Sequence, residues 1–69
     1  MKLSARNRLS GRVTKVTLGE AAAAVELDVA GNRMVASITA EAVRDLDLKE
    51  GVEVIAIVKA SDVILARED

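Results

Sequence analysis

The chain has 69 residues, a net charge of −1, and no histidine, cysteine or aromatic residue. This length predicts one domain, residues 1–69, and the composition excludes disulfides, Cys/His metal sites and the usual nucleophile–base pairs of covalent catalysis. Hydrophobic residues make up 51% of the chain, but a core of this size supplies only about 3–5 kcal/mol. Because a disulfide or Cys/His-bound metal cannot add to that, we expect the protein to be stabilised by forming an oligomer.

The charged side chains are mixed in sign along the chain, 10 basic against 11 acidic. They create no basic field that would attract nucleic acid or an anionic membrane surface. No apolar run approaches the length of a membrane span, and polar residues follow directly after Met1, unlike a signal peptide. We therefore expect a cytoplasmic protein without nucleic-acid or membrane partners.

Residues 3–18 are predicted to form one long strand, because apolar and polar residues alternate along them. Ser4 and Arg6 share the polar face of its first half. The apolar face of that half consists of Leu3, Ala5, Leu9 and Val13. After Val13 the alternation changes phase, which is typical of a β-bulge, and Gly11 nearby would allow a tight bend.

Residues 21–30 and 34–39 are predicted to form the second and third strands, joined by a hairpin turn over 30–33. Thr39 is predicted to be the N-cap of a short helix. The apolar stripe of this helix consists of Ala42, Val43 and Leu46. The helix is expected to end before Gly51, where the chain turns.

Residues 52–59 are predicted to form a fourth strand that is apolar on both faces, because Ile55 and Ile57 lie opposite the valines. Such a strand is normally covered on both sides, and in so small a barrel we expect the second cover to be another subunit. Residues 62–66 are predicted to form the last strand. Three strands, a short helix and two strands predict an all-β, five-stranded OB-type barrel with the helix between strands three and four.

Hydrogen-bond donors cluster near two predicted strand ends, Ser4 with Arg6 and Lys59 with Ser61. A tetrahedral dianion presents only acceptors, so Arg, Lys, Ser hydroxyl and backbone N–H groups are suitable ligands for it. The small Ala5 and Ala60 side chains leave room for backbone amides to approach. We expect the fold to bring the two clusters together across a subunit boundary, where they would bind a small oxyanion.

Other functions are also considered. The carboxylates of residues 45–53 are predicted to be a solvated helix end and turn, since Asp45-x-Asp47 is too sparse for a cation site. Arg6, Arg8 and Arg12 share one predicted strand face, which favours single-stranded nucleic-acid binding, but OB domains use aromatic platforms for that purpose. We expect these arginines to pair with acidic side chains on neighbouring strands or subunits. A structural or interaction module without active oxyanion sites stays open as an alternative.

Three motifs of the chain resemble those of the molbindins, the stand-alone form of a molybdate-binding domain that also occurs in regulators and transporter ATPases. The opening motif is Ser4-Ala5-Arg6-Asn7 followed by Leu9-x-Gly11-x-Val13. The middle motif is Ala36-x-Ile38-Thr39 followed by Leu46-x-Leu48-Lys49-x-Gly51. The closing motif is Val58-Lys59-Ala60-Ser61-Asp62-Val63-Ile64-Leu65.

This resemblance implies a binding or storage protein for molybdate or tungstate rather than an enzyme, with sites at the subunit interfaces of a homohexamer built as a trimer of dimers. The oxyanion ligands that it implies are Ser4, Arg6, Lys59, Ser61 and the backbone of Ala60, with Thr39 from the facing subunit. Many molbindins have Ser where this chain has Ala42, and this departure implies weaker binding if that hydroxyl is a ligand. The resemblance also implies a second class of site near the threefold axis, for which backbone amides around residues 19–21 are a candidate.

Overall fold

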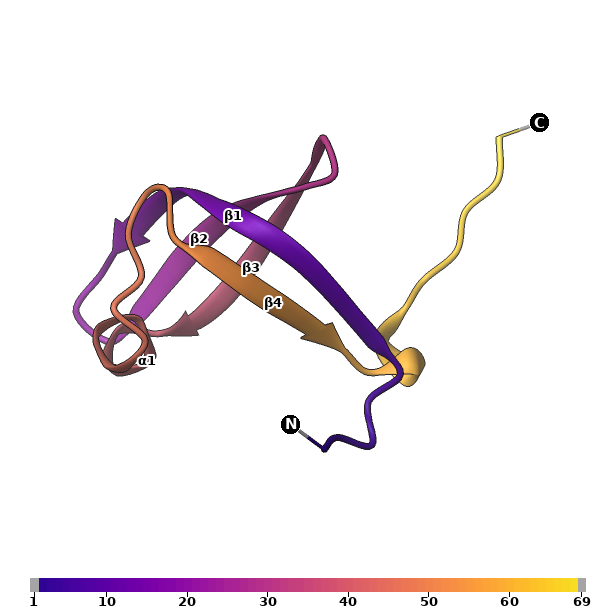
Figure 1. Cartoon of the computed structure of the whole chain (residues 1–69), viewed down its shortest axis with the longest axis horizontal. Coiled ribbons are helices and arrows are strands. Elements are labelled where there is room, and N and C mark those ends of the chain that lie inside the picture. Colours follow the sequence, from indigo (N-terminus) through magenta and orange to yellow (C-terminus); the bar gives the residue numbers. More distant parts are fainter. Residues whose placement is uncertain (1, 69) are drawn as a thin grey trace.

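The computed structural model describes residues 2–68 and consists of one curled antiparallel sheet with a short helix at one end (Figure 1). The sheet order is β3-β2-β1-β4. The elements in chain order are β1 (Asn7–Leu18), β2 (Ala22–Val29), β3 (Asn32–Thr39), α1 (Ala40–Asp45), β4 (Glu53–Val58) and the 3₁₀ turn η1 (Ala60–Asp62). The all-β class and the helix between the third and fourth strands are confirmed. The predicted strand count of five is wrong, because the sheet has four strands, and the sheet does not close into a barrel, since β3 and β4 are its unpaired edges.

The predicted fifth strand, residues 62–66, is not a strand in this chain. Asp62 ends η1, and the backbone becomes extended at Val63, with φ −82° and ψ 126°. The tail then leads away from the sheet (Figure 1), and Ile64 and Leu65 are 92% and 89% exposed. Alternating apolar residues favour an extended backbone, but a strand also needs a neighbouring strand to complete its hydrogen bonds.

The first strand begins at Asn7 rather than at residue 3, and the chain bends at Ser4. Its ladder with β4 starts at Asn7, which lies opposite Val58, so the residues before Asn7 have no ladder to join. The predicted apolar face is consequently covered only in part: Val13 is 1% exposed, but Leu9 is 37% exposed.

β1 serves two sides of the sheet, and the predicted bulge lies where it changes partner. Val13 is opposite Leu27 and Lys15 is opposite Glu26, so Thr14 is the extra residue. The Thr14 hydroxyl donates to the carbonyl oxygen of Glu26 at 3.1 Å. Gly11 has a different function from the predicted bend, because a Cβ there would lie 3.0 Å from the Asp28 carbonyl oxygen. Its missing side chain allows close packing against β2.

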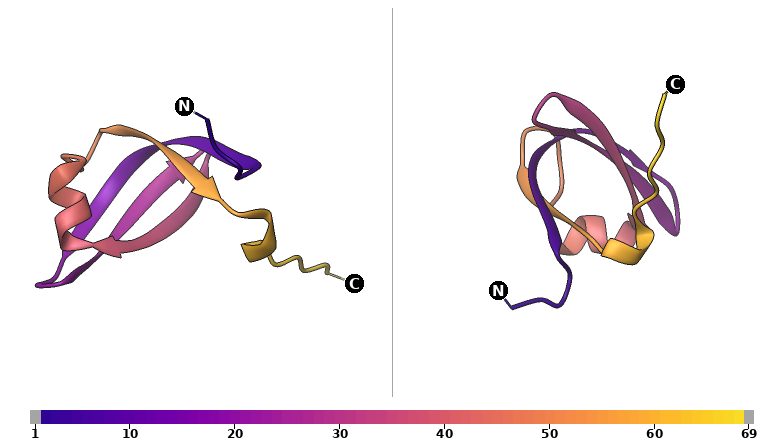
Figure 2. Two further views of the ribbon diagram at one scale, coloured as in Figure 1. Left: turned by 90° about the horizontal axis from the view of Figure 1, so that it is seen from below. Right: turned by 90° about the vertical axis from the view of Figure 1, so that its right-hand side faces the viewer.

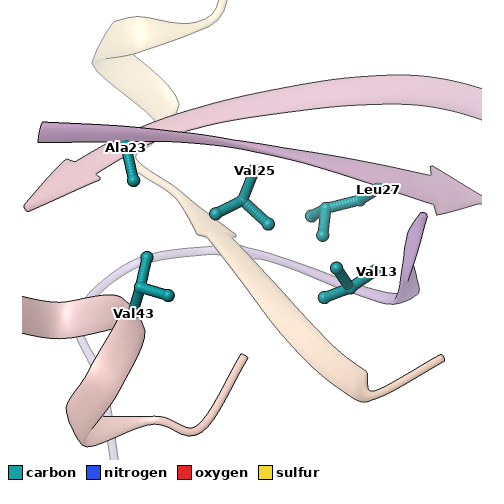
Figure 3. Packing of buried hydrophobic residues seen from close by; sticks show 5 residues of the cluster. All are labelled: Val13, Ala23, Val25, Leu27 and Val43. Carbon is teal, nitrogen blue, oxygen red and sulfur yellow. The ribbon is translucent and has the colours of Figure 1, made fainter. Parts of the chain in front are cut away.

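The hydrophobic core lies between β1, β2 and α1. Figure 3 shows Val43 of α1 pointing toward the buried side chains of the sheet. The cluster consists of Val13, Ala23, Val25, Leu27 and Val43. α1 is fixed there by its predicted N-cap, since the Thr39 Oγ1 accepts a hydrogen bond from the Ala42 N–H at 3.0 Å. In Figures 1 and 2 the helix lies across one end of the sheet, and η1 lies at the other end.

β4 has the predicted two apolar faces. Val54, Ala56 and Val58 are half-buried against the core side, and Ile55 and Ile57 are 53% and 43% exposed on the other. The exposed isoleucines line an open groove of about 910 Å³. None of the helical segments within residues 2–68 is long and apolar enough to cross a bilayer.

Candidate functional site

The two predicted donor clusters lie at the same end of the sheet. The β1–β4 ladder ends with Asn7 opposite Val58, so Arg6 and Lys59 are the next residues outward on the two chain segments. Both the N-terminal segment and η1 lie at the end of the sheet far from α1 (Figures 1 and 2). The antiparallel pairing of β1 with β4 is therefore what places Ser4 and Arg6 near the segment that begins at Lys59.

The second cluster is built on the tight turn after β4. Lys59 is extended, with φ −64° and ψ 137°, and its carbonyl oxygen accepts the Asp62 N–H at 2.9 Å. The first N–H groups of a helical turn have no acceptor within the turn itself. This geometry leaves the amides of Ala60 and Ser61 suitable as ligands for an acceptor-only anion.

Thr39 lies at the opposite end of the sheet from these donors. It is paired with Ala22, and the adjacent Ala23 is paired with Leu18 at the far end of β1. From residue 7 to residue 18 a strand extends about 36 Å at the usual rise per residue. Thr39 can therefore meet the other predicted ligands only if it comes from a second copy of the chain. Its oxygen already caps α1, and its O–H is still able to donate.

Arg12 has acidic residues opposite it on both neighbouring strands. Its Nη2 lies 3.8 Å from the Glu53 Oε1, and it is opposite Asp28 in the β1–β2 ladder. The expectation that the arginines pair with acidic side chains is correct for this residue. Within residues 2–68 the other ion pairs are Arg33–Glu26 and Lys49–Asp47, and no pair includes a cation of the donor clusters.

An open hollow of about 400 Å³ lies beside the first donor cluster. Its lining residues are Lys2, Leu3, Ala5, Arg6 and Arg8. The charged members of this lining are all cationic. Lys2 is not among the predicted ligands, and the sequence pattern predicted an ion pair for Arg8. The only sequence signal that Arg8 belongs with Arg6 was their shared strand face. The register of β1 against β4 shows that Arg8 lies opposite Ile57 and not opposite an acidic residue.

The remaining charged groups have structural positions. Arg33 Nε donates to Glu26 Oε1 at 2.8 Å across the β2–β3 hairpin, and this hydrogen bond lowers the pKa of Glu26. The acidic residues at the end of α1 and in the following turn are exposed, as predicted; they are Asp45, Asp47, Glu50 and Glu53. Over residues 2–68 the structure contains no cluster of three acidic side chains that could hold a metal ion.

Comparison with known sequences finds relatives along almost the whole chain. The model of the TOBE domain family matches residues 3–65. The chain is 42% identical over 66 residues to molybdenum-pterin-binding protein 3 of Clostridium pasteurianum, covering 94% of this chain and 97% of that protein. It is 39% identical over 69 residues to a probable molybdenum-pterin-binding protein of Haemophilus influenzae, covering 99% and 100% of the two chains.

Solved structures give the same relationship. A molybdate-binding protein from Sporomusa ovata has a TM-score of 0.93 and 39% identity, covering 97% of this chain and 100% of that one. The cytoplasmic molybdate-binding protein ModG, solved with molybdate bound, has a TM-score of 0.88 and 42% identity, covering 93% of this chain and 46% of that one. Three motifs in the same order, the curled four-stranded sheet and these relatives agree, and the chain belongs to the TOBE domain family, among the molbindin-type molybdenum-pterin-binding proteins.

Proposed function

We propose that this protein binds molybdate or tungstate in the cytoplasm and stores it at the subunit interfaces of a homo-oligomer. The observation that carries the proposal is the end of the β1–β4 ladder at Asn7 and Val58, which makes Arg6 and Lys59 the next residues outward on the two segments. The relatives are named for binding molybdate or a molybdenum-pterin, which is the kind of ligand that this donor set suits.

The chemistry of the cluster favours a fully deprotonated dianion. Guanidinium, ammonium and backbone N–H groups donate hydrogen bonds and cannot accept them. Bonds from charged donors to an oxyanion are shorter and stronger than neutral ones. The chain has neither histidine nor cysteine, so the Ser–His and Cys–His pairs of covalent catalysis are missing from it. Binding without a chemical step is therefore the proposed activity.

A second copy of the chain is expected to complete the site. Two sheet edges, β3 and β4, are unpaired in one chain, and the extended tail exposes Ile64 and Leu65 almost completely. An extended apolar segment can add as a strand to an unpaired sheet edge. The added strand completes the backbone hydrogen bonds of the edge and buries apolar side chains at the same time. We infer that subunits associate through these surfaces, as dimers within a homohexamer, and that Thr39 of a facing copy then reaches the donors at the other end of the sheet.

Titration calorimetry with a series of anions tests this function. Molybdate and tungstate have the same charge and nearly the same size, so we expect them to bind about equally. Sulfate has the right charge but shorter bonds, which would stretch its hydrogen bonds in a rigid pocket, and it should bind more weakly. Phosphate at neutral pH carries an O–H whose hydrogen bond the Ser hydroxyls accept only weakly and the guanidinium, ammonium and backbone N–H groups cannot accept. An unpaired buried O–H costs about 1–3 kcal/mol.

The expected order is molybdate and tungstate first, then sulfate, then phosphate. A short single-stranded oligonucleotide serves as the control for the common activity of OB domains. Phosphate binding as tightly as molybdate, or an oligonucleotide binding in place of the anions, would contradict the proposed function. Absence of any binding would favour the alternative of an interaction module whose sites are inactive.

A further inference from the structure

Arg8 and Arg12 are the same residue type on the same face of β1, but their surroundings differ. Arg12 lies opposite Glu53 on one side and opposite Asp28 on the other. Arg8 lies opposite Ile57 on β4, and β1 begins to pair with β2 only at Arg12. Acidic residues lie opposite Arg12 on both neighbouring strands, and none lies opposite Arg8.

The charged residues that line the hollow with Arg8, and the one diagonal to it in the β1–β4 ladder, are cationic. The diagonal neighbours of a residue in an antiparallel pair lie two positions from its partner, which for Arg8 are Ile55 and Lys59. Two residues before Arg8 on its own segment is Arg6, and both arginines line the 400 Å³ hollow with Lys2. The mutual repulsion of these three cations is unfavourable unless a bound anion balances their charge. Arg8 thus extends the positive field of the donor clusters outward into solvent.

We propose that Arg8 captures the dianion for the site: it attracts the oxyanion toward Arg6 and Lys59 and thereby sets the association rate, without being one of the final ligands. This inference rests on the proposed oxyanion binding. A charge at the rim of a binding site changes mainly the association rate and its salt dependence, whereas a buried ligand changes the dissociation rate. A dianion feels twice the attraction of a monoanion, so this cation also favours molybdate, tungstate and sulfate over singly charged competitors.

The test compares Arg8→Gln with Arg12→Gln, two variants that lower the net charge equally. Because the chain has no aromatic residue, intrinsic fluorescence cannot report binding. Calorimetry gives Kd for molybdate, exchange of radioactive molybdate against an unlabelled excess gives the dissociation rate, and their quotient gives the association rate. Both variants are measured at roughly 10 mM and roughly 500 mM salt, where the screening length differs severalfold.

At low salt we expect Arg8→Gln to slow association about three- to tenfold, with the dissociation rate within about twofold of the parent. The difference should nearly vanish at high salt, because screening removes steering. Arg12→Gln should leave the association rate within about twofold of the parent at either salt concentration. Far-UV circular dichroism and sedimentation of both variants should match the parent.

Four results would overturn this inference while leaving the proposed function intact. These are equal slowing by both variants, an unchanged association rate in Arg8→Gln, a large rise in its dissociation rate, or a changed oligomer mass. The first would mean that net charge alone steers the ligand. The third would make Arg8 a direct ligand, and the fourth would mean that Arg8 pairs with an acidic residue of another subunit. Failure of the parent protein to bind molybdate would instead refute the proposed function.

Discussion

The two ends of β1 differ in almost every physical respect. From its middle toward α1, the strand pairs with β2, Val13 is 1% exposed, and Arg12 has acidic residues opposite it. At the other end Leu9 is 37% exposed, β4 is the strand partner, and the cations lack ion pairs within residues 2–68. One strand therefore carries the core of the domain at one end and the candidate site at the other.

This division has a physical reason. A site that binds an anion needs donors without internal partners, and such groups cannot be part of a packed, neutral core without a large cost. Moving the donors to the end of a long strand keeps them attached to the sheet but outside its packing. Stability and binding should then respond to different substitutions, and the predictions below test that separation, beginning with the largest expected effect.

The largest effect is expected from Leu27→Ala at the core end. Leu27 is 4% exposed and belongs to the buried cluster, and removing such a side chain costs about 2–5 kcal/mol. The variant should have a much lower free energy of unfolding, measured by urea denaturation. In a domain this small the loss approaches the whole stability, so the variant should be partly unfolded even without urea.

Leu9→Ala at the other end is the matched control, because it removes the same atoms from a more exposed position. It should cost less than about 1 kcal/mol in the same titration. The sequence pattern alone predicts that Leu9 is a core residue, for which the loss would be about 2–5 kcal/mol. Equal losses for the two variants would show that the open end of β1 is packed as well as the other.

The second prediction concerns the tail. Ile64→Asp places a charge on a side chain that is 92% exposed in one chain and that we expect to be buried by another subunit. Each copy would lose about 1.5–3 kcal/mol of apolar burial, and sedimentation at micromolar concentration should show smaller assemblies. Arg67→Gln, two residues beyond Leu65, is the control because it lowers the net charge by the same amount. It should leave the mass of the assembly unchanged. A parent protein that sediments as a folded monomer would contradict the oligomer.

The tail also shows which structural features could be predicted from the sequence and which could not. Local signals predicted the hairpin, where Ala30 and Gly31 have positive φ of 51° and 87°, and the Thr39 cap, because each depends on adjacent residues. The alternation in residues 62–66 predicted a strand, whereas Asp62 ends η1 and the backbone is extended at Val63 without a partner strand in the same chain. Pairing is a long-range property, so the pattern alone could not supply it.

For the candidate site, too, some features could be predicted from local sequence and others depended on long-range strand pairing. Residue type and motif predict Ser4, Arg6, Lys59 and Ser61 as donors, and the β1–β4 ladder brings Arg6 and Lys59 to the same end of the sheet. Their role as ligands stays a prediction. The difference between Arg8 and Arg12 was not predictable, since both occupy equivalent places in the alternation. Only the register of β1 against β4 and β2 shows which arginine has an acidic neighbour.

The third prediction addresses the donors themselves. Arg6→Ala and Lys59→Ala each remove a charge-assisted hydrogen bond worth about 1.5–3 kcal/mol. Calorimetry should therefore show molybdate binding weakened about ten- to a hundredfold, with little change in the urea midpoint. Both side chains are exposed, so no core volume is lost.

Arg12→Ala and Lys15→Ala are the matched controls, because they remove the same groups from the part of β1 that faces acidic partners. Neither should change molybdate affinity by more than about twofold. If Arg6→Ala and Lys59→Ala both bound molybdate like the parent, the site would have to lie elsewhere on the chain.

The last prediction separates the two functions assigned to Thr39. Its oxygen caps α1 by accepting the Ala42 N–H, and its O–H is the proposed donor to an oxyanion on a neighbouring copy. Thr39→Ala loses both groups and should destabilise the fold by about 1 kcal/mol. Thr39→Asp retains a capping acceptor at the positive end of the helix, so its urea midpoint should stay near that of the parent. An ionised carboxylate cannot donate a hydrogen bond and repels a dianion, so molybdate binding should still weaken. Parent-like affinity in the stable Thr39→Asp variant would restrict Thr39 to capping and leave the site to the donors at the far end of β1.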